Sequence, residues 1–177
     1  NYKNIKFEKK IFSSFSKVYV DNFLKDKNVI DSDIIEVHNR PNYIRYIKNN
    51  FTRKISLYFH NDPLSMEGSK SIQDRMYLID NIDKLIFNSV WSKNRFFLNL
   101  NMNISNLKDV NVCYQSCNKV KIDFRKKENI ITFIGKLNRA KGYDIFGNAI
   151  IDILNKYKNW KAIVIGDEER EIINFKH

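Results

Sequence analysis

The sequence predicts an α/β protein made of two Rossmann-like lobes with parallel sheets. Along its 177 residues, short runs of β-branched and aromatic residues alternate with longer segments of helical periodicity. Several of the short runs are apolar at consecutive positions, which is typical of parallel strands covered on both faces. A polar stretch at 118–129 divides the alternation in two. We therefore expect β-α-β units with right-handed crossovers on each side of it.

Six runs are predicted as strands: Asp33–His38, Lys54–His60, Lys84–Asn88, Val110–Gln115, Ile130–Leu137 and Trp160–Gly166. Tyr143–Tyr157 gives the clearest helical pattern, because its apolar residues fall on one stripe: Phe146, Ala149, Ile150, Ile153 and Leu154. Ser69–Asn81 is a second helix, with Ile72, Met76 and Ile79 spaced for one face. Ser89 is placed to cap the start of a further helix.

The domain organisation predicted from this pattern has three parts. Residues 1–118 form the later part of a first lobe, 119–129 a linker, and 130–177 the start of a second lobe. A lobe of about 50 residues is only marginally stable alone. The chain starts with Asn and has no signal peptide, so we expect a segment of a longer protein in which both lobes are incomplete.

The net charge of +11 is weak evidence for a nucleic-acid partner. Lys, Asn and Ile together supply 72 residues, a bias typical of codon usage, and the lysines are scattered. We therefore expect a solvated basic face and no nucleic-acid binding, with peripheral contact to an anionic membrane surface as an open alternative. No apolar run reaches the ~18 residues that span a bilayer, and the two cysteines make no disulfide framework. These features favour a cytoplasmic protein with reduced thiols.

Two strand ends repeat one motif. His38-Asn39-Arg40-Pro41 and His60-Asn61-Asp62-Pro63 lie 22 residues apart and contain both prolines of the chain. Ligands of open parallel sheets bind beyond the carboxyl ends of the strands, and histidine suits proton transfer or polarisation of a sugar hydroxyl. The alternative is that each histidine caps a helix or hydrogen-bonds a backbone carbonyl. A metal site at His38, His60 and Asp62 has no further support, and no metal is expected.

The fifth strand end carries a glycine-bracketed basic loop, Gly135–Gly142, just before the Tyr143–Tyr157 helix. A flexible turn, exposed N–H groups at a helix start and the cations Lys136, Arg139 and Lys141 suit a phosphate group. The loop matches neither GxGxxG nor a Walker loop, so a solvated βα loop is the alternative.

Residues 130–142 resemble the opening of the C-terminal domain of family 4 glycosyltransferases, which have the GT-B fold. That family has a strand, then Gly-Arg-Leu, three variable residues and Lys-Gly; here Lys136 stands at the arginine position and Lys141 at the lysine position. The segment Ile163–Asp167 is similar to the family's second strand, which ends Gly-Asp-Gly. Upstream, residues 33–38, 54–62 and 84–91 resemble successive strands of the N-terminal domain.

The resemblance implies a retaining, metal-independent glycosyltransferase that needs no cofactor. It would move a sugar from a nucleotide-sugar donor to a glycan or lipid-linked acceptor, such as a lipopolysaccharide or another surface glycan. Gly135, Lys136 and Lys141 would bind the donor diphosphate. His60 and, less directly, Asp62 would act at the reacting centre, and His38 and Arg40 would line the acceptor side. A GT-B nucleotide-sugar epimerase and a noncatalytic nucleotide-sugar-binding remnant are the alternatives.

The sequence departs from the family pattern at several places. Lys136 replaces an arginine, which removes bidentate contact with phosphate, and Glu168 replaces the second glycine of Gly-Asp-Gly. The family's Asn-Gly before the linker reads Tyr-Gln-Ser-Cys at 114–117. The N-terminal glycine-rich loop and the later pair of glutamates have no counterpart. We therefore expect this chain to be inactive by itself.

Overall fold

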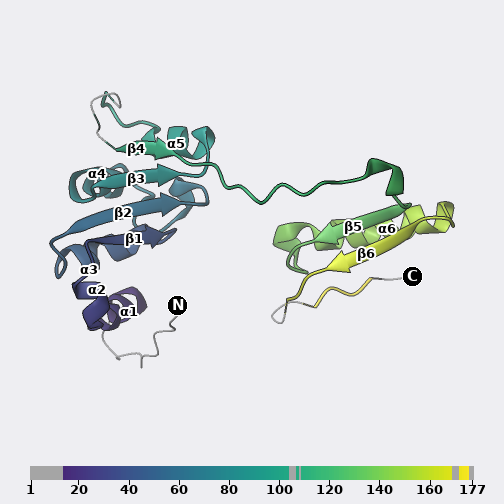
Figure 1. The fold of residues 1–177 in the computed structure, drawn as a ribbon, viewed down its shortest axis with the longest axis horizontal. Helices are drawn as coiled ribbons and strands as arrows, with labels where there is room; N and C mark the ends of the chain where they lie inside the picture. Colours follow the sequence, from purple (N-terminus) through teal and green to yellow (C-terminus); the bar gives the residue numbers. More distant parts are fainter. Residues whose placement is uncertain (1–13, 104–106, 108, 169–171, 176–177) are drawn as a thin grey trace. The chain divides into compact units, whose positions relative to one another are not determined.

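The computed structural model describes residues 14–103, 107, 109–168 and 172–175. The chain forms two compact units, residues 1–117 and residues 118–177 (Figure 1). The first contains a four-stranded parallel sheet and the second a two-stranded parallel sheet. The predicted α/β class with parallel sheets is therefore confirmed.

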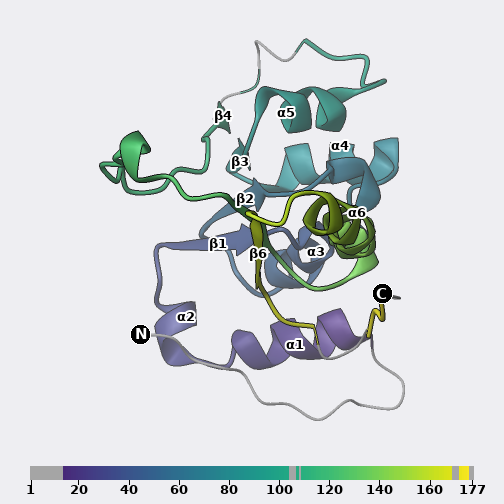
Figure 2. The same ribbon diagram turned by 90° about the vertical axis from the view of Figure 1, so that its right-hand side faces the viewer.

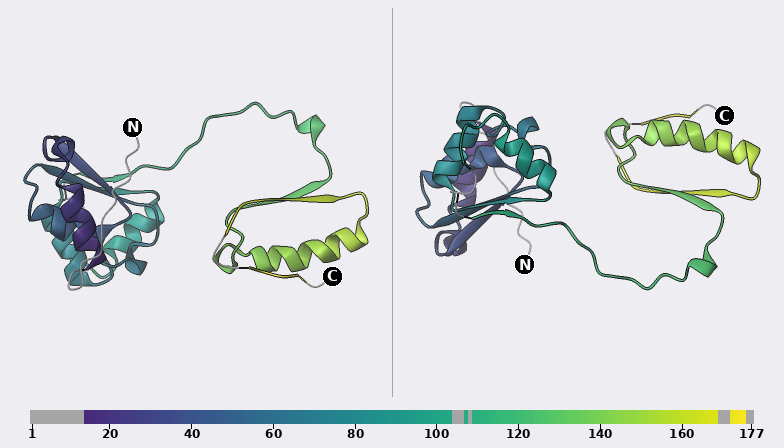
Figure 3. Two further views of the ribbon diagram at one scale, coloured as in Figure 1. Left: turned by 90° about the horizontal axis from the view of Figure 1, so that it is seen from below. Right: turned by 90° about the horizontal axis from the view of Figure 1, so that it is seen from above.

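The first unit has strands in sequential order across its sheet: β1 (Ile34–His38), β2 (Lys54–Phe59), β3 (Lys84–Phe87) and β4 (Val110–Val112). Its helices are α1 (Phe15–Phe23), α2 (Lys27–Ile30), α3 (Ile44–Lys48), α4 (Ile72–Asn81) and α5 (Val90–Phe97), with 3₁₀ turns η1 (Pro41–Tyr43) and η2 (Pro63–Ser65). Helices α3, α4 and α5 lie on one face of the sheet (Figures 2 and 3). Right-handed crossovers between adjacent parallel strands place successive helices on the same side.

The two faces of this sheet differ in chemistry. On β1, Ile35 and Val37 are buried, whereas Glu36 and His38 between them are exposed. Side chains alternate between the faces of a strand, so β1 turns its apolar residues to the helices and its polar residues away from them. The contiguous apolar runs predict a sheet that is covered on both faces. In the part of the chain that the structure describes, helices cover one face of this sheet only.

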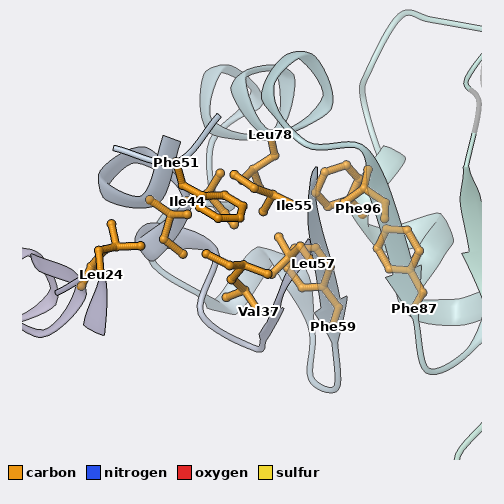
Figure 4. Packing of buried hydrophobic residues seen from close by; sticks show 14 of the residues in the cluster. Leu24, Val37, Ile44, Phe51, Ile55, Leu57, Phe59, Leu78, Phe87 and Phe96 are labelled. Carbon is orange, nitrogen blue, oxygen red and sulfur yellow. The ribbon is translucent and has the colours of Figure 1, made fainter. Parts of the chain in front are cut away.

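The hydrophobic core lies between the sheet and its helices (Figure 4). Phe59 at the end of β2, Phe87 at the end of β3 and Phe96 on α5 are fully buried, and each pair of rings has centroids 5.4 Å apart. Aromatic pairs at this separation add about 0.5–1.5 kcal/mol beyond area burial. The aromatic cluster therefore fixes the carboxyl ends of the two central strands.

Element boundaries differ from the predictions in a consistent direction. The strands predicted to reach His60, Asn88, Gln115 and Leu137 end at Phe59, Phe87, Val112 and Ile134. Helix α4 begins at Ile72 rather than Ser69, because Ser71 caps it by accepting from the N–H of Asp74 at 3.0 Å. The Ser89 cap of α5 is confirmed, with its hydroxyl oxygen accepting from the N–H of Ser92 at 3.1 Å.

The second unit contains β5 (Ile130–Ile134), β6 (Lys161–Ile165), α6 (Tyr143–Lys156) and 3₁₀ turns η4 (Phe124–Lys126) and η5 (Arg139–Lys141). Phe133 of β5 packs on Tyr143 and Phe146 of α6, with both ring centroids 5.2 Å away. Helix α6 matches the predicted helix to within one residue. It buries Ile150, whereas Ile134 at the end of β5 is 76% exposed.

A buried cation joins α4 to the end of α5 in the first unit. Arg75 is 3% exposed, and its guanidinium donates to the carbonyls of Phe96 and Leu98, the latter at 2.7 Å. Its Nε donates to the carbonyl of Ser71 at 3.2 Å. The side chain thus satisfies backbone acceptors that helix α5 leaves open at its C-terminus.

Replacing Arg75 with Met tests this role. Arg75→Met should lower the free energy of unfolding of the first unit by about 3 kcal/mol, because buried carbonyls lose their donors. Arg45→Met is the matched control: Arg45 is 55% exposed and pairs with Asp74, so its loss should cost at most about 1 kcal/mol. Urea unfolding followed by Trp91 fluorescence in a Trp160→Phe background measures both. Equal losses would contradict the assigned role of Arg75.

Candidate functional site

His38 and His60 meet at the carboxyl edge of the first unit's sheet. His38 ends β1 and is in register with Tyr58 of β2, two residues before His60. The imidazole rings are stacked with centroids 5.1 Å apart, and His38 Nδ1 lies 2.8 Å from His60 Nε2. The two His-Asn-x-Pro motifs therefore bring their histidines into direct contact.

The asparagine of the first motif fixes the backbone of the second. Asn39 adopts a left-handed conformation with φ of 57°, and its Oδ1 accepts from the N–H groups of His60 at 3.2 Å and Asn61 at 3.3 Å. Asn88, which follows β3, donates from Nδ2 to the carbonyl of His60 at 2.7 Å. Asparagine tolerates the left-handed region better than most residues. These bonds hold His60 at the sheet edge.

A chain of four side chains runs through the two rings. Glu36 Oε1 lies 2.7 Å from His38 Nε2, and Gln115 Nε2, beyond the end of β4, lies 2.9 Å from His60 Nδ1. With the bond between the rings, all four ring nitrogens contact side chains. The alternative in which each histidine caps a helix or bonds a backbone carbonyl is therefore wrong.

The surroundings of His60 disfavour its charged form. Burial lowers the pKa of His60, and the positive charge of His38 lowers it further, while the Glu36 carboxylate acts in the opposite direction. Tyr58 stacks on the His60 ring at 4.3 Å, and its hydroxyl donates to the carbonyl of Cys113 at 2.6 Å. His60 is thus held as a neutral imidazole near neutral pH.

Asp62 takes part in a different set of contacts. Its Oδ1 accepts from the N–H of Leu64 at 3.0 Å at the start of η2, and its Oδ2 lies 3.1 Å from Arg95 Nη2. The hydrogen bond from Arg95 lowers the pKa of the Asp62 carboxyl. Among the described contacts, none joins Asp62 to either histidine. Its carboxylate stabilises the turn after β2 and ties it to α5.

A cavity of about 430 Å³ opens beside His38 in the first unit. Its polar lining comes from Glu36, His38 and Arg40. Its apolar lining comes from α1, β1 and the η1–α3 region: Phe15, Tyr19, Val20, Phe23, Ile35, Val37, Tyr43 and Ile47. The side chain of Arg40 is exposed and donates to the carbonyl of Asn39 at 3.2 Å. The cavity can take a ligand with one apolar and one polar part.

The basic loop of the second unit is held by a close approach of two glycines. The N–H of Gly135 donates to the carbonyl of Ile165 at 3.0 Å, and φ of Gly135 is 154°. A Cβ on Gly166 would lie 1.7 Å from the carbonyl oxygen of Gly135, so no larger residue fits there. The turn that follows β5 therefore lies directly against the end of β6.

Lys136 and Lys141 flank the rest of this turn. Asn138 caps η5 by accepting from the N–H of Lys141 at 3.1 Å, and Gly142, with φ of 73°, is the N-cap residue of α6. Both lysine side chains are exposed, and neither forms an ion pair within the described residues. Asn138 also donates to Glu168 Oε2 at 2.9 Å. A carboxylate therefore binds the residue that caps η5, at the position where the resemblance expects glycine.

Two residues of the histidine chain were absent from the sequence prediction. Glu36 lies two residues before His38, so strand alternation could have placed both on one face. Gln115 is 55 residues from His60, and no local pattern indicates that contact. Within the described residues, no group of three or more His, Cys, Asp or Glu side chains is arranged to bind a metal ion.

Comparisons with known proteins add no family. No protein-family model matches the chain, and a search of curated proteins found no match. The described part of the chain has no helix with the length and apolarity needed to cross a bilayer.

The lowered pKa of His60 predicts how stability changes with pH. The folded state binds a proton on His60 more weakly than the unfolded chain does. The contribution of His60 to the free energy of unfolding is therefore complete above the ordinary pKa of 6.5 and is lost as pH falls through the lowered pKa. His60→Gln should flatten this part of the urea-midpoint profile between about pH 8 and about pH 5, followed by Trp91 fluorescence in a Trp160→Phe background. Asn61→Gln, a neighbouring change without a titrating group, should keep the wild-type slope. An unchanged slope in His60→Gln would contradict the prediction.

Proposed function

We propose that the chain belongs to a glycosyltransferase of the GT-B type that moves a sugar from a nucleotide-sugar donor to a glycan or lipid-linked acceptor. The observation that carries the proposal is the loop from Gly135 to Gly142. It follows a parallel strand, opens helix α6 and presents Lys136 and Lys141 to solvent without ion-pair partners in the described part of the chain. A helix start flanked by cations is suited to a diphosphate.

In this proposal the two lysines offset the charge that develops on the departing diphosphate. Gly135 allows the turn that brings the backbone close to the phosphates. The reaction requires no metal, because the lysines supply the positive charge. We propose retention of configuration at the anomeric carbon because of the resemblance to family 4 glycosyltransferases, and for no other reason.

The histidine pair would serve the reacting centre and the acceptor. His60 would hydrogen-bond the reacting sugar, and the Arg95-bound Asp62 would support the turn that carries it. His38 and Arg40, which line the cavity beside β1, would contact the acceptor. The proposed setting is the cytoplasm, with peripheral contact to an anionic membrane surface through the basic face.

A noncatalytic nucleotide-sugar-binding protein is the second candidate. The Glu168 carboxylate bonded to Asn138 favours it, since a negative charge held on the loop that carries the lysines weakens attraction for a diphosphate. A GT-B epimerase would use the same donor site. Product analysis distinguishes the three candidates. The glycosyltransferase transfers the sugar to an acceptor, the epimerase inverts one carbon of the sugar, and the binding protein leaves the nucleotide sugar unchanged.

The double variant Lys136→Ala/Lys141→Ala tests the donor site. Calorimetry on the 177-residue chain uses UDP-glucose, GDP-mannose and ADP-glucose as probes. The variant should bind whichever probe the wild type binds about tenfold more weakly or worse, because charge-assisted contacts to the diphosphate are lost. Lys158→Ala/Lys161→Ala removes the same charge near the start of β6, at the opposite end of the strand, and should leave affinity unchanged. Absence of binding by the wild type, or equal losses in both variants, would refute the proposal.

A further inference from the structure

The orientation of the Gln115 amide assigns a direction to the hydrogen bonds of the histidine chain. Gln115 Nε2 is an amide nitrogen, which can only donate, so the His60 Nδ1 that it contacts at 2.9 Å must present a lone pair. In a neutral ring the proton then lies on His60 Nε2, which donates to His38 Nδ1 at 2.8 Å. His38 carries its own proton on Nε2 and donates to the Glu36 carboxylate at 2.7 Å. In this arrangement of two neutral rings every donor has an acceptor.

The opposite direction requires one more proton. If the Gln115 carbonyl faced His60 Nδ1, that nitrogen would carry the proton, and His60 Nε2 would accept from His38 Nδ1. His38 Nε2 would then also need a proton, because a bare nitrogen cannot face the Glu36 carboxylate, so the two rings together would carry one more proton. Reversal of the Gln115 amide is therefore linked to one additional proton on the two rings.

The groups around the rings act on proton uptake in opposite directions: burial of His60 opposes it, and the Glu36 carboxylate favours it. Glu36 on β1 is the only charged side chain bonded to either ring among the described contacts. On β2, the Tyr58 hydroxyl is bonded to the carbonyl of Cys113, and burial leads the causes that raise the pKa of Tyr58. The Arg40 guanidinium, on the loop after β1, donates to the carbonyl of Asn39 rather than to a ring.

We propose that Glu36, His38 and Gln115 are positioning residues that hold His60 in the Nε2–H tautomer, with Nδ1 as a hydrogen-bond acceptor for a substrate hydroxyl. Gln115 is exposed and lies in the irregular segment after β4, so its amide can give way to a ligand. Because Nδ1 accepts, the ligand group there must be a donor. A hydroxyl fits, whereas a phosphate or carboxylate oxygen does not.

The assignment of the hydroxyl to a sugar substrate rests on the proposed function, but the tautomer does not. The tautomer can be measured without any ligand, by imidazole ¹⁵N spectra of the 177-residue chain. The chain has only three histidines, so His38→Gln and His60→Gln identify the signals. At neutral pH both His38 and His60 should show a protonated Nε2 and a lone pair on Nδ1.

Two changes at Glu36 separate its hydrogen bond from its charge. Glu36→Ala removes the acceptor of His38 Nε2–H, so both rings should become mixtures of tautomers. Glu36→Gln retains an acceptor oxygen and should restore the single tautomer. Asp33→Ala removes the same charge just before β1, where the side chain is fully exposed, and should leave both rings unchanged.

A change at Gln115 tests the other end of the chain. A carboxylate cannot donate to a lone pair, so Gln115→Glu should move the His60 proton to Nδ1 and raise the pH at which the pair takes up its proton. Ser116→Glu places the same charge one residue away and should keep the Nε2–H tautomer. The size of the pH shift in Ser116→Glu measures the charge effect alone.

The proposal is overturned if wild-type His60 is protonated on Nδ1, if Glu36→Ala keeps the wild-type spectrum, or if Gln115→Glu keeps the Nε2–H tautomer. These readouts need no nucleotide sugar. Failure of the donor-site test would therefore leave them intact, and failure of the tautomer test would leave the donor-site result intact.

Discussion

The parallel pairing of β1 with β2 is the constraint on which the sheet-edge site depends. In this register His38 stands opposite Tyr58, so His60, just beyond the end of β2, reaches His38 from the same edge. A slip of one residue would turn Glu36 and His38 toward the helices and Ile35 and Val37 toward solvent. Burial of the two apolar residues therefore enforces the register that brings the histidines together.

The strands could be predicted from the sequence because their apolar residues are contiguous. Their predicted C-terminal ends lie too far along the chain, because the polar residues that follow each strand do not mark where the hydrogen-bonded ladder stops. Asn88 looks like a continuation of β3, yet its side chain leaves the ladder to hold His60. The short helix α3 escaped prediction, since five residues are too few to establish a period. The contact of Gln115 with His60 depends on the order of four strands, which no local pattern contains.

The basic loop shows a related limit. In the sequence, the glycines of the loop indicate places where the chain can bend. The steric constraint in the structure is at Gly166, whose missing side chain lets the carbonyl of Gly135 approach. Glu168 looked in the sequence like a small departure from a family pattern. In the structure it bonds the same Asn138 that caps η5, so this carboxylate is part of how the loop is held.

The alternation of buried and exposed residues along β1 separates residues that the fold requires from residues that a ligand can contact. Ile35, Val37 and Leu57 determine whether the sheet folds, while Glu36 and His38, interleaved with the first two, determine what its open face can bind. A mutation on the open face leaves the packing of the core untouched. Relatives of this chain could therefore diverge in ligand while keeping the same buried residues, and the polar positions of β1 would record that divergence.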